Sequence, residues 1–338
     1  MLHYTGGVVL MCLRATFLHL YPGYRNILTG PWQHWSLVGD SHLRYIFDAL
    51  TQRLRDYPPL EYRIISHKNN SRGRVTKWSD AEDFLSYLRF DSYTSDIQIR
   101  HTQSRFTLTW YYDPLLLRLP YLLKVWMEEE VEQEQENVDE EEKVDEEEKV
   151  EEEDEDEEEK VEEKVQQLHR PSLLVINSGL HWLSFLDKAY TSGLENNSAT
   201  LVMFEAQLNQ LSPILGRFAK HTPTVFKLLD DVQAADTNPE SEEVMSRTNL
   251  CHYNEITVSA LRGSGVKVWD STLPLSLGYN HQCSLHPTRT TVNYWWKCHD
   301  KRHVGYVLVE QYVDMLLNHA CNFYLLVQQR IHRGHCVS

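Results

Sequence analysis

The chain has 338 residues, of which 41% are hydrophobic, so it is long enough to bury a sizeable core in one or two domains. Its net charge of −16 is distributed unevenly. Residues 128–164 hold 25 acidic and 4 basic residues, whereas the remainder holds 24 acidic and 29 basic residues and has a charge of +5. Because the remainder has no strong positive charge, we expect no nucleic-acid partner.

The N-terminal segment, residues 1–31, predicts no clear membrane span. Its apolar run over residues 6–13 is too short to cross a bilayer, and Arg14 follows it directly. The segment is at best a poor or truncated signal peptide. Two Asn-x-Ser tripeptides, at Asn69 and Asn196, would suit a secretory-pathway protein but do not establish one.

Residues 34–45 predict a short apolar strand that turns at Gly39 and Asp40 and continues directly into a helix. The helix is indicated by apolar residues on one face of a 3.6-residue period: Leu43, Ile46, Phe47, Leu50 and Leu54. Ser41 therefore lies at the helix N-terminus, where the first backbone N–H groups have no intrahelical partner and the dipole favours negative charge. Its hydroxyl could cap the helix, or it could be a nucleophile whose oxyanion is bound by those N–H groups.

Arg44 lies one helical turn after Ser41. Its guanidinium could hold a substrate anion, or it could pair with Asp48 at i,i+4 on the same helix. We favour the ion pair.

The next predicted elements are a strand over 62–66, a polar loop over 67–76, a short helix over 80–88 and one or two strands over 97–112. Residues 115–126 are apolar, with Pro120 among them. They predict an amphipathic surface helix or a lid.

Residues 127–167 predict a disordered, acidic, low-complexity insertion. Valine recurs every six residues, at Val138, Val144 and Val150, which matches neither a heptad nor a 3.6-residue period. With almost no apolar side chains, the segment cannot offset the entropy of ordering. It would promote solubility, bind a basic partner or bind calcium weakly.

After the insertion, the pattern predicts strands over 172–177, 201–204, 224–229 and 266–270, and helices over 181–190, 206–220 and 244–261. This alternation predicts an α/β domain with a parallel sheet that is covered by helices on both faces. The insertion then divides one domain into residues 32–126 and residues 168–325, and a tail follows over 326–338.

Asp300 and His303 form an Asp-x-x-His pair just before a C-terminal helix pattern. A serine nucleophile needs a base, and the base needs an orienting carboxylate, so this pair supplies both. Sites of α/β folds lie beyond the carboxyl ends of the strands, where Ser41 and this loop both fall. His286 and His299 are rival bases, but neither has the Asp-x-x-His spacing.

The six cysteines show no Cys-x-x-Cys spacing, so we expect no metal site. Cys283 and Cys298 flank the approach to Asp300. A disulfide between them would hold the loop that carries the base, but two ordinary buried thiols are an equally open interpretation.

Short motifs give the chain a resemblance to a known family. Gly-Asp-Ser at residues 39–41, combined with Asp-x-x-His at residues 300–303, is the arrangement of the SGNH/GDSL hydrolase superfamily. Residues 173–182, Leu-Leu-Val-Ile-Asn-Ser-Gly-Leu-His-Trp, resemble a strand-end motif of its PC-esterase branch. Residues 106–114 resemble that branch's apolar strand ending in Trp and Pro. The branch includes the trichome-birefringence-like and the sialic acid and capsule O-acetyltransferases, and the resemblance spans roughly residues 32–320.

This resemblance implies a three-layer SGNH-like (flavodoxin-like) fold and a serine-dependent mechanism. Ser41 would be the nucleophile, His303 the general base and then acid, and Asp300 the carboxylate that orients His303. The oxyanion would be bound by the Ser41 N–H, the Gly73 N–H and the side-chain amide of Asn177. A turn residue at a strand end is the alternative for Asn177.

The candidate substrate contacts are Arg44, His181, Trp182, Trp295 and Trp296. This chain has an additional Leu180 within the family motif, so either His181 or Trp182 could take the family's usual position. Trp295 and Trp296 could stack on a sugar ring, or they could pack in the core or a lid.

These features predict serine-dependent acyl transfer, by an O-acetyltransferase or an O-acyl esterase, on a carbohydrate or glycoconjugate through an acyl-serine intermediate. No cofactor is expected, although an acetyl donor such as acetyl-CoA would be a substrate. The family resemblance implies a location in the secretory pathway, the Golgi or outside the cell. The alternative is a non-catalytic binding protein of the same fold, in which the acidic insertion binds the partner.

Overall fold

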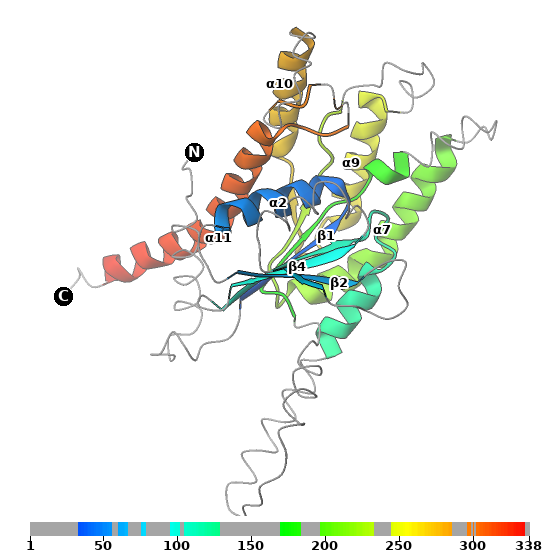
Figure 1. The fold of residues 1–338 in the computed structure, drawn as a ribbon. Coiled ribbons are helices and arrows are strands. Elements are labelled where there is room, and N and C mark those ends of the chain that lie inside the picture. The colour runs from blue at the N-terminus through cyan, green and yellow to red at the C-terminus, as the bar shows by residue number, and fades with distance from the viewer. Residues whose placement is uncertain are drawn as a thin grey trace, which may run out of the picture.

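The computed structural model describes residues 33–55, 60–66, 76–78, 95–101, 105–128, 170–183, 197–232, 245–285, 296–298, 300 and 302–334. They form an α/β fold around an eight-stranded, mostly parallel sheet with the strand order β3-β2-β4-β5-β1-β6-β7-β8 (Figure 1). The strands are β1 (Gln33–Gly39), β2 (Leu60–Ser66), β3 (Thr76–Trp78), β4 (Asp96–His101), β5 (Phe106–Tyr112), β6 (Leu173–Ile176), β7 (Thr224–Lys227) and β8 (Lys267–Trp269). The helices are α2 (Ser41–Leu54), α7 (Asn197–Ala219), α9 (Arg247–Leu261), α10 (Thr272–Leu285) and α11 (Tyr306–Gly334).

Strands β5, β1, β6, β7 and β8 are parallel neighbours, whereas β4, β2 and β3 extend the sheet beyond β5 in antiparallel pairs. The prediction of an all-parallel sheet is therefore wrong at this edge. Only residues 102–105 connect β4 to β5. So short a connection forces antiparallel pairing, because a parallel crossover needs a dozen or more residues.

The side chains of the central strands alternate between two hydrophobic clusters. In β1, Trp35 and Leu37 belong to the first cluster and Val38 to the second. In β6, Val175 and Ile176 divide in the same way. Helices α2 and α11 contribute to the first cluster, and helices α7 and α9 contribute to the second. Both faces of the central strands are buried, which explains their continuous apolar runs.

Residues 201–204 lie in helix α7, so the strand predicted there is wrong. A run of four apolar residues does not distinguish a strand from a helix by periodicity. The helix buries one face, formed by Phe204, Leu208, Leu211 and Leu215. Val202, on the opposite face, is 60% exposed. The helix predicted over 206–220 is the continuation of the same element.

The helix or lid predicted over 115–126 is a helix over 119–128 that packs into the core. Its buried side chains are Leu119, Leu122, Leu123 and Trp126. Asp113 precedes the helix and accepts hydrogen bonds from the backbone N–H groups of Leu117, Arg118 and Leu119. Because its apolar face belongs to the second cluster, this helix is a fixed part of the fold and not a lid.

Helices α2 and α11 lie side by side on one face of the sheet (Figure 1). Arg53, near the end of α2, binds two acidic residues of α11. Its Nε lies 2.7 Å from Glu310 Oε2, and its Nη1 lies 2.6 Å from Asp314 Oδ1. Since the two carboxylates are one helical turn apart, a single guanidinium holds the helices in register.

Several predictions lie outside the described part of the chain. They concern the N-terminal segment, the loop around Gly73, the helix over 80–88, most of the acidic insertion and the end of the C-terminal tail. The domain boundaries therefore stay predictions. Within the residues that the structure describes, no helix combines the length and the apolar character needed to cross a membrane.

Gly39 provides a test of how tightly the strand ends pack. A Cβ atom at this position would lie 2.4 Å from the backbone carbonyl oxygen of Asn177. We expect Gly39→Ala to lower the free energy of unfolding by about 1–3 kcal/mol, because two backbone segments would have to separate. Urea unfolding measures this loss. Gly278→Ala is the matched control, since no described atom outside its own stretch of helix lies within 4 Å of its Cβ position. Equal unfolding free energies for the two variants would contradict the expectation.

Candidate active site

The turn between β1 and α2 places Ser41 at the first position of the helix. Asp40 is the N-cap residue, because its Oδ1 accepts a hydrogen bond from the backbone N–H of His42 at 2.9 Å. The Asp40 carbonyl accepts the first intrahelical bond, from Arg44. Asp40 thus performs the capping, and the Ser41 hydroxyl is left for another partner.

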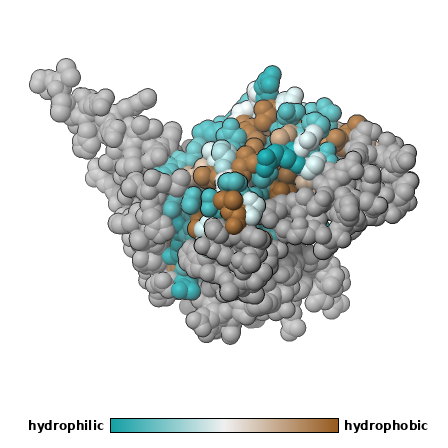
Figure 2. Space-filling view, turned by 90° about the horizontal axis from the view of Figure 1, so that it is seen from above, coloured by the Kyte–Doolittle hydropathy of each residue, from teal (hydrophilic) through white to brown (hydrophobic). Residues whose placement is uncertain are grey.

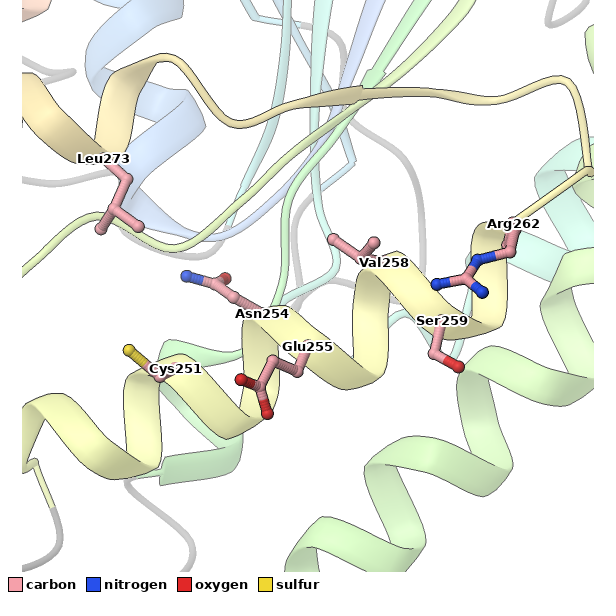
Figure 3. Close-up of a pocket in the computed structure, with 7 residues that line it drawn as sticks. All are labelled: Cys251, Asn254, Glu255, Val258, Ser259, Arg262 and Leu273. Atoms are coloured by element: carbon pink, nitrogen blue, oxygen red, sulfur yellow. The ribbon is translucent and has the colours of Figure 1, made fainter.

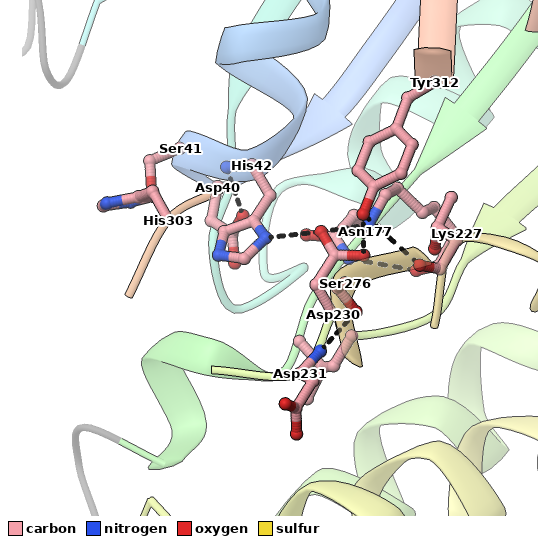
Figure 4. A network of polar contacts seen from close by, with 12 residues as sticks. Asp40, Ser41, His42, Asn177, Lys227, Asp230, Asp231, Ser276, His303 and Tyr312 are labelled. Carbon is pink, nitrogen blue, oxygen red and sulfur yellow. Dashed lines mark hydrogen bonds and ion pairs between the residues drawn. The ribbon is translucent and has the colours of Figure 1, made fainter. Parts of the chain in front are cut away.

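That partner is His303, which Figure 4 shows beside Ser41. Ser41 Oγ lies 2.7 Å from His303 Nε2, although the two residues are 262 positions apart in the sequence. His303 Nδ1 lies 3.0 Å from Asp300 Oδ2. Since a carboxylate only accepts hydrogen bonds, Nδ1 carries the proton and Nε2 accepts from the Ser41 hydroxyl. The geometry is that of a nucleophile, a base and an orienting carboxylate.

The loop that carries His303 is held by internal hydrogen bonds and by a disulfide. Asp300 Oδ1 accepts hydrogen bonds from the backbone N–H groups of Arg302 and His303, both at 3.1 Å. A disulfide joins Cys283 of α10 to Cys298, two residues before Asp300. Of the two interpretations of these cysteines, the structure therefore contains the disulfide.

The aromatic ring of Tyr45 lies beside the His303 imidazole. The ring centroid of Tyr45 lies 5.0 Å from that of His303, in an edge-on arrangement, and 5.9 Å from that of Tyr306. Lys297 Nζ donates to the Tyr45 hydroxyl at 2.9 Å. The Tyr306 hydroxyl donates to Asp48 of α2. These contacts connect α2 to the loop of His303 and restrict rotation of the imidazole.

Burial and neighbouring charges determine the protonation of this pair. Burial lowers the pKa of His303 below 6.5, and nearby His42 lowers it further, against the raising effect of Asp300. Burial raises the pKa of Asp300, but the hydrogen bond and charge of His303, together with the Arg302 N–H and the Lys297 charge, outweigh burial and lower that pKa to about 2. At neutral pH, the pair is a neutral imidazole and an ionised carboxylate, which is the state required of a base.

A second polar network lies next to Ser41 (Figure 4). His42 Nδ1 lies 3.2 Å from Asp230 Oδ2, which belongs to the segment after β7. The Asp230 carboxylate also accepts hydrogen bonds from Lys227 Nζ at 2.8 Å and from the Tyr312 hydroxyl at 3.1 Å. All four side chains are buried, so the charges of Lys227 and Asp230 must compensate each other within the core.

Asn177 follows β6 at the same edge of the sheet, but its side chain is engaged elsewhere. It is fully buried, and its Nδ2 donates to the backbone carbonyl of Lys227 at 2.9 Å. The backbone carbonyl oxygen of Asn177 is the atom that a Cβ at Gly39 would meet. Asn177 therefore joins β6 to β7 and supports the turn before Ser41. These contacts do not support the oxyanion role predicted for its amide.

Trp182 is a core residue, which does not support its predicted role as a substrate contact. It is 6% exposed, and its ring centroid lies 5.8 Å from that of Phe204 in the second cluster. His181 is half-buried, and its ring lies 6.3 Å from that of Tyr112 at the end of β5. Of these two neighbours, His181 is therefore the one left as a candidate for the family position.

Arg44 is 4% exposed, and its guanidinium lies 5.6 Å from the ring centroid of Tyr45. So buried a side chain does not suit contact with a substrate anion. Asp48, its expected partner, accepts hydrogen bonds from Gln52 and Tyr306.

Trp296 stacks on Tyr279, with ring centroids 5.5 Å apart and planes at 8°. This contact favours the packing interpretation for Trp296, and its substrate role stays a prediction. Four other candidates lie outside the described residues, and their roles stay predictions: Gly73, Trp295, His286 and His299.

Sequence pattern alone indicated no role for His42, Lys227, Asp230 or Tyr312. One signal was available for Asp230, because it is an acidic residue directly after a buried strand. Polar residues in that position point to the carboxyl edge of the sheet, where Ser41 also lies.

Two further features carry no part of this chemistry. Within the residues that the structure describes, no group of three or more His, Cys, Asp or Glu side chains could hold a metal ion. An open hollow on α9 (Figure 3) is lined by Cys251, Asn254, Glu255, Val258, Ser259, Arg262 and Leu273. None of these residues belongs to the Ser41 site.

A scan against protein-family models and a search of curated proteins both found no match. Among solved structures, the chain is similar to an alpha/beta hydrolase enzyme from the metagenome of Lake Arreo, Spain, at 11% sequence identity. The similarity covers 88% of this chain and 98% of that chain, with a TM-score of 0.36. So distant a likeness carries no argument about family or activity.

Proposed function

We propose that the protein catalyses serine-dependent acyl transfer, as an O-acetyltransferase or esterase acting on a carbohydrate or glycoconjugate. The observation that carries this proposal is the 2.7 Å contact between Ser41 Oγ and His303 Nε2. Two further contacts support it. The Asp300 carboxylate binds the far side of the His303 imidazole, and Asp40 caps the helix, so the Ser41 hydroxyl is not needed as a cap. We assign the fold to the three-layer SGNH type on the resemblance of the motifs around these residues.

In the first half-reaction, Ser41 Oγ attacks the carbonyl carbon of an acyl donor while His303 Nε2 takes the hydroxyl proton. Asp300 stabilises the resulting imidazolium through the Nδ1–H bond. His303 then donates that proton to the leaving alcohol or thiol, and the acyl group remains as an ester of Ser41. A donor such as acetyl-CoA would be a substrate and not a resident cofactor.

In the second half-reaction, a hydroxyl group gives its proton to His303 and attacks the acyl carbon. The bond to Ser41 Oγ breaks, and His303 returns the proton to that oxygen. With water as the attacking group the protein is an esterase, and with a sugar hydroxyl it is a transferase.

The oxyanion would be bound at the N-terminus of α2, where N–H groups point out of the helix and the dipole favours negative charge. The His42 N–H is already bonded to Asp40, so the Ser41 N–H is the better donor. We propose the Gly73 N–H as a second donor. The Asn177 amide is a weaker candidate because Lys227 accepts one of its hydrogens.

The carbohydrate acceptor is proposed from the resemblance of residues 106–114 and 173–182 to the PC-esterase branch. A location in the secretory pathway or outside the cell is supported by the disulfide between Cys283 and Cys298, because disulfides persist in oxidising compartments. The acidic insertion would bind a basic partner.

Labelling with a fluorophosphonate probe tests the nucleophile. We expect the wild type to be labelled, Ser41→Ala to lose all labelling, and His303→Ala to react about 10²–10⁴-fold more slowly because the hydroxyl lacks its base. Ser259→Ala, at an exposed serine of α9, is the control and should label like the wild type. If the wild type is not labelled under conditions in which a known serine esterase is labelled, the proposal is wrong.

The pH dependence of that labelling tests the base. His303 accepts a proton only when it is neutral, so the rate should be constant at high pH and fall as pH drops through the pKa of His303. Burial, the largest cause, holds this pKa below 6.5, so the midpoint should lie below 6.5. Asp300 stays ionised down to a pH of about 2 and adds no step in this window. A midpoint well above 6.5 would contradict the assignment.

The disulfide should hold the loop of the base. We expect Cys283→Ser combined with Cys298→Ser to lower the free energy of unfolding by about 3 kcal/mol, because a loop of 15 residues is released. Labelling of Ser41 should slow as well, since Asp300 lies two residues from Cys298. Cys251→Ser, at an exposed free thiol, is the control. Thermal unfolding and labelling rates that match those of the wild type would count against this role.

A further inference from the structure

A second Asp–His pair lies beside the one that serves Ser41. His42 follows Ser41 in the chain, and its Nδ1 lies 3.2 Å from Asp230 Oδ2 (Figure 4). The ring centroids of His42 and His303 are 5.3 Å apart. His42 is 6% exposed, so its ring is a neighbour of the base within the core and does not face solvent.

The hydrogen bonds of Asp230 define the tautomer of His42. The Asp230 carboxylate accepts from Lys227 Nζ at 2.8 Å and from the Tyr312 hydroxyl at 3.1 Å. A carboxylate in this setting is ionised and only accepts, so His42 Nδ1 carries a proton. His42 Nε2 is buried and has no hydrogen-bond partner among the described residues. The charge of His42 depends on whether this second nitrogen also carries a proton.

The charges that face His42 favour that proton. Two carboxylates face the ring: Asp230 beyond β7 and Asp40 in the turn before α2. One cation faces it, Lys227 of β7, which is 0% exposed and already bonded to Asp230. The second oxygen of Asp40 is buried without a hydrogen-bond partner in the described part of the chain.

The remaining neighbours are other titratable groups. Tyr312 of α11 and His303 of the preceding loop both approach this network, and Arg44 and Asp48 lie further along α2. Arg44 and Asp48 carry opposite charges. Lys227 balances the charge of Asp230, and a positive His42 balances the charge of Asp40. A neutral His42 would leave these four side chains with a net negative charge in the core.

We propose that His42, held by Asp230, is a buried imidazolium that keeps the neighbouring His303 imidazole unprotonated. His42 is then a positioning residue that acts through His303 and does not touch the substrate. A positive charge 5.3 Å from the His303 ring opposes a second positive charge there, so the base stays neutral at a lower pH than it would alone. The benefit to catalysis rests on the function proposed above, whereas the charge states of the two rings do not.

The electrostatics of the two rings agree with this assignment. Burial and the Lys227 charge lower the pKa of His42, but the Asp230 hydrogen bond and the charges of Asp40 and Asp230 together outweigh them, so this pKa is raised above 6.5. The pKa of His303 is lowered, first by burial and then by His42 itself. Two adjacent titratable groups whose environments move their pKa values apart divide the acid and base states between them.

Histidine side-chain NMR of the full-length protein tests the charge states without any need for activity. Spectra of the ¹⁵N-labelled wild type, recorded across pH 4–9, give the pKa of each ring, and His42→Asn and His303→Ala assign the two signals. We expect His42 to titrate above His303. Titration of His42 below His303 in the wild type would overturn the proposal.

The same experiment on His42→Asn tests the coupling. Asparagine keeps a donor near the position of Nδ1 but has no charge, so the pKa of His303 should rise by about 1, a tenfold gain in proton affinity. Tyr312→Phe is the matched control, because it removes the hydrogen bond that the Tyr312 hydroxyl donates to Asp230 and leaves His42 charged. An unchanged His303 pKa in His42→Asn, or an equal rise in both variants, would contradict the role of His42.

The pH profile of fluorophosphonate labelling connects this result to function. If Ser41 is the nucleophile, the midpoint in His42→Asn should move upward by the same amount as the NMR titration of His303. An NMR shift without labelling of the wild type would reject the proposed function and keep the charge assignment. If the pKa of His303 shifts in His42→Asn but the midpoint of the labelling profile does not, the role of His42 in catalysis is rejected.

Discussion

The packing of α2 against α11 is the contact on which the site depends. Ser41 begins one of these helices, and His303 lies just before the other. The distance between hydroxyl and imidazole is therefore set by how the two helices meet. Their apolar faces share one cluster, and Arg53 bridges them through Glu310 and Asp314. The proposed proton transfer would tolerate little misplacement, so a rigid helix pair is a suitable support for it.

The carboxyl ends of the parallel strands form a second support, because each is bonded to the next. The backbone N–H of Asn177, which follows β6, donates to the carbonyl of Val38 in β1. Asn177 donates to the carbonyl of Lys227 in β7, and Leu228 donates to the carbonyl of Trp269 in β8. This row of bonds at one edge of the sheet fixes the turn that presents Ser41.

Buried charge is the unusual feature of this edge. A lysine, an aspartate and a histidine lie within the core next to the base, where each would be costly alone. Such networks rigidify a site when every member is satisfied. Here the buried nitrogen of His42 and one oxygen of Asp40 lack partners in the described part of the chain. Buried polar atoms without hydrogen-bond partners are expected at sites where function and stability conflict.

Sequence by itself determined the local features of the site. The start of α2 at Ser41 follows from apolar spacing, and the pairing of Asp300 with His303 follows from their separation of three residues. Short segments carry such information, although an apolar run as brief as residues 201–204 misled, since strand and helix share it.

The meeting of His303 with Ser41 across 262 positions was expected from the motifs. Only the tertiary structure showed that Asn177 engages Lys227 across 50 positions and that His42 lies against Asp230 across 188. It also turned the strands beyond β5 antiparallel and buried Trp182 in the core. Local periodicity contains no term for these contacts, because they depend on how whole elements pack and on which buried polar groups are left to pair with one another.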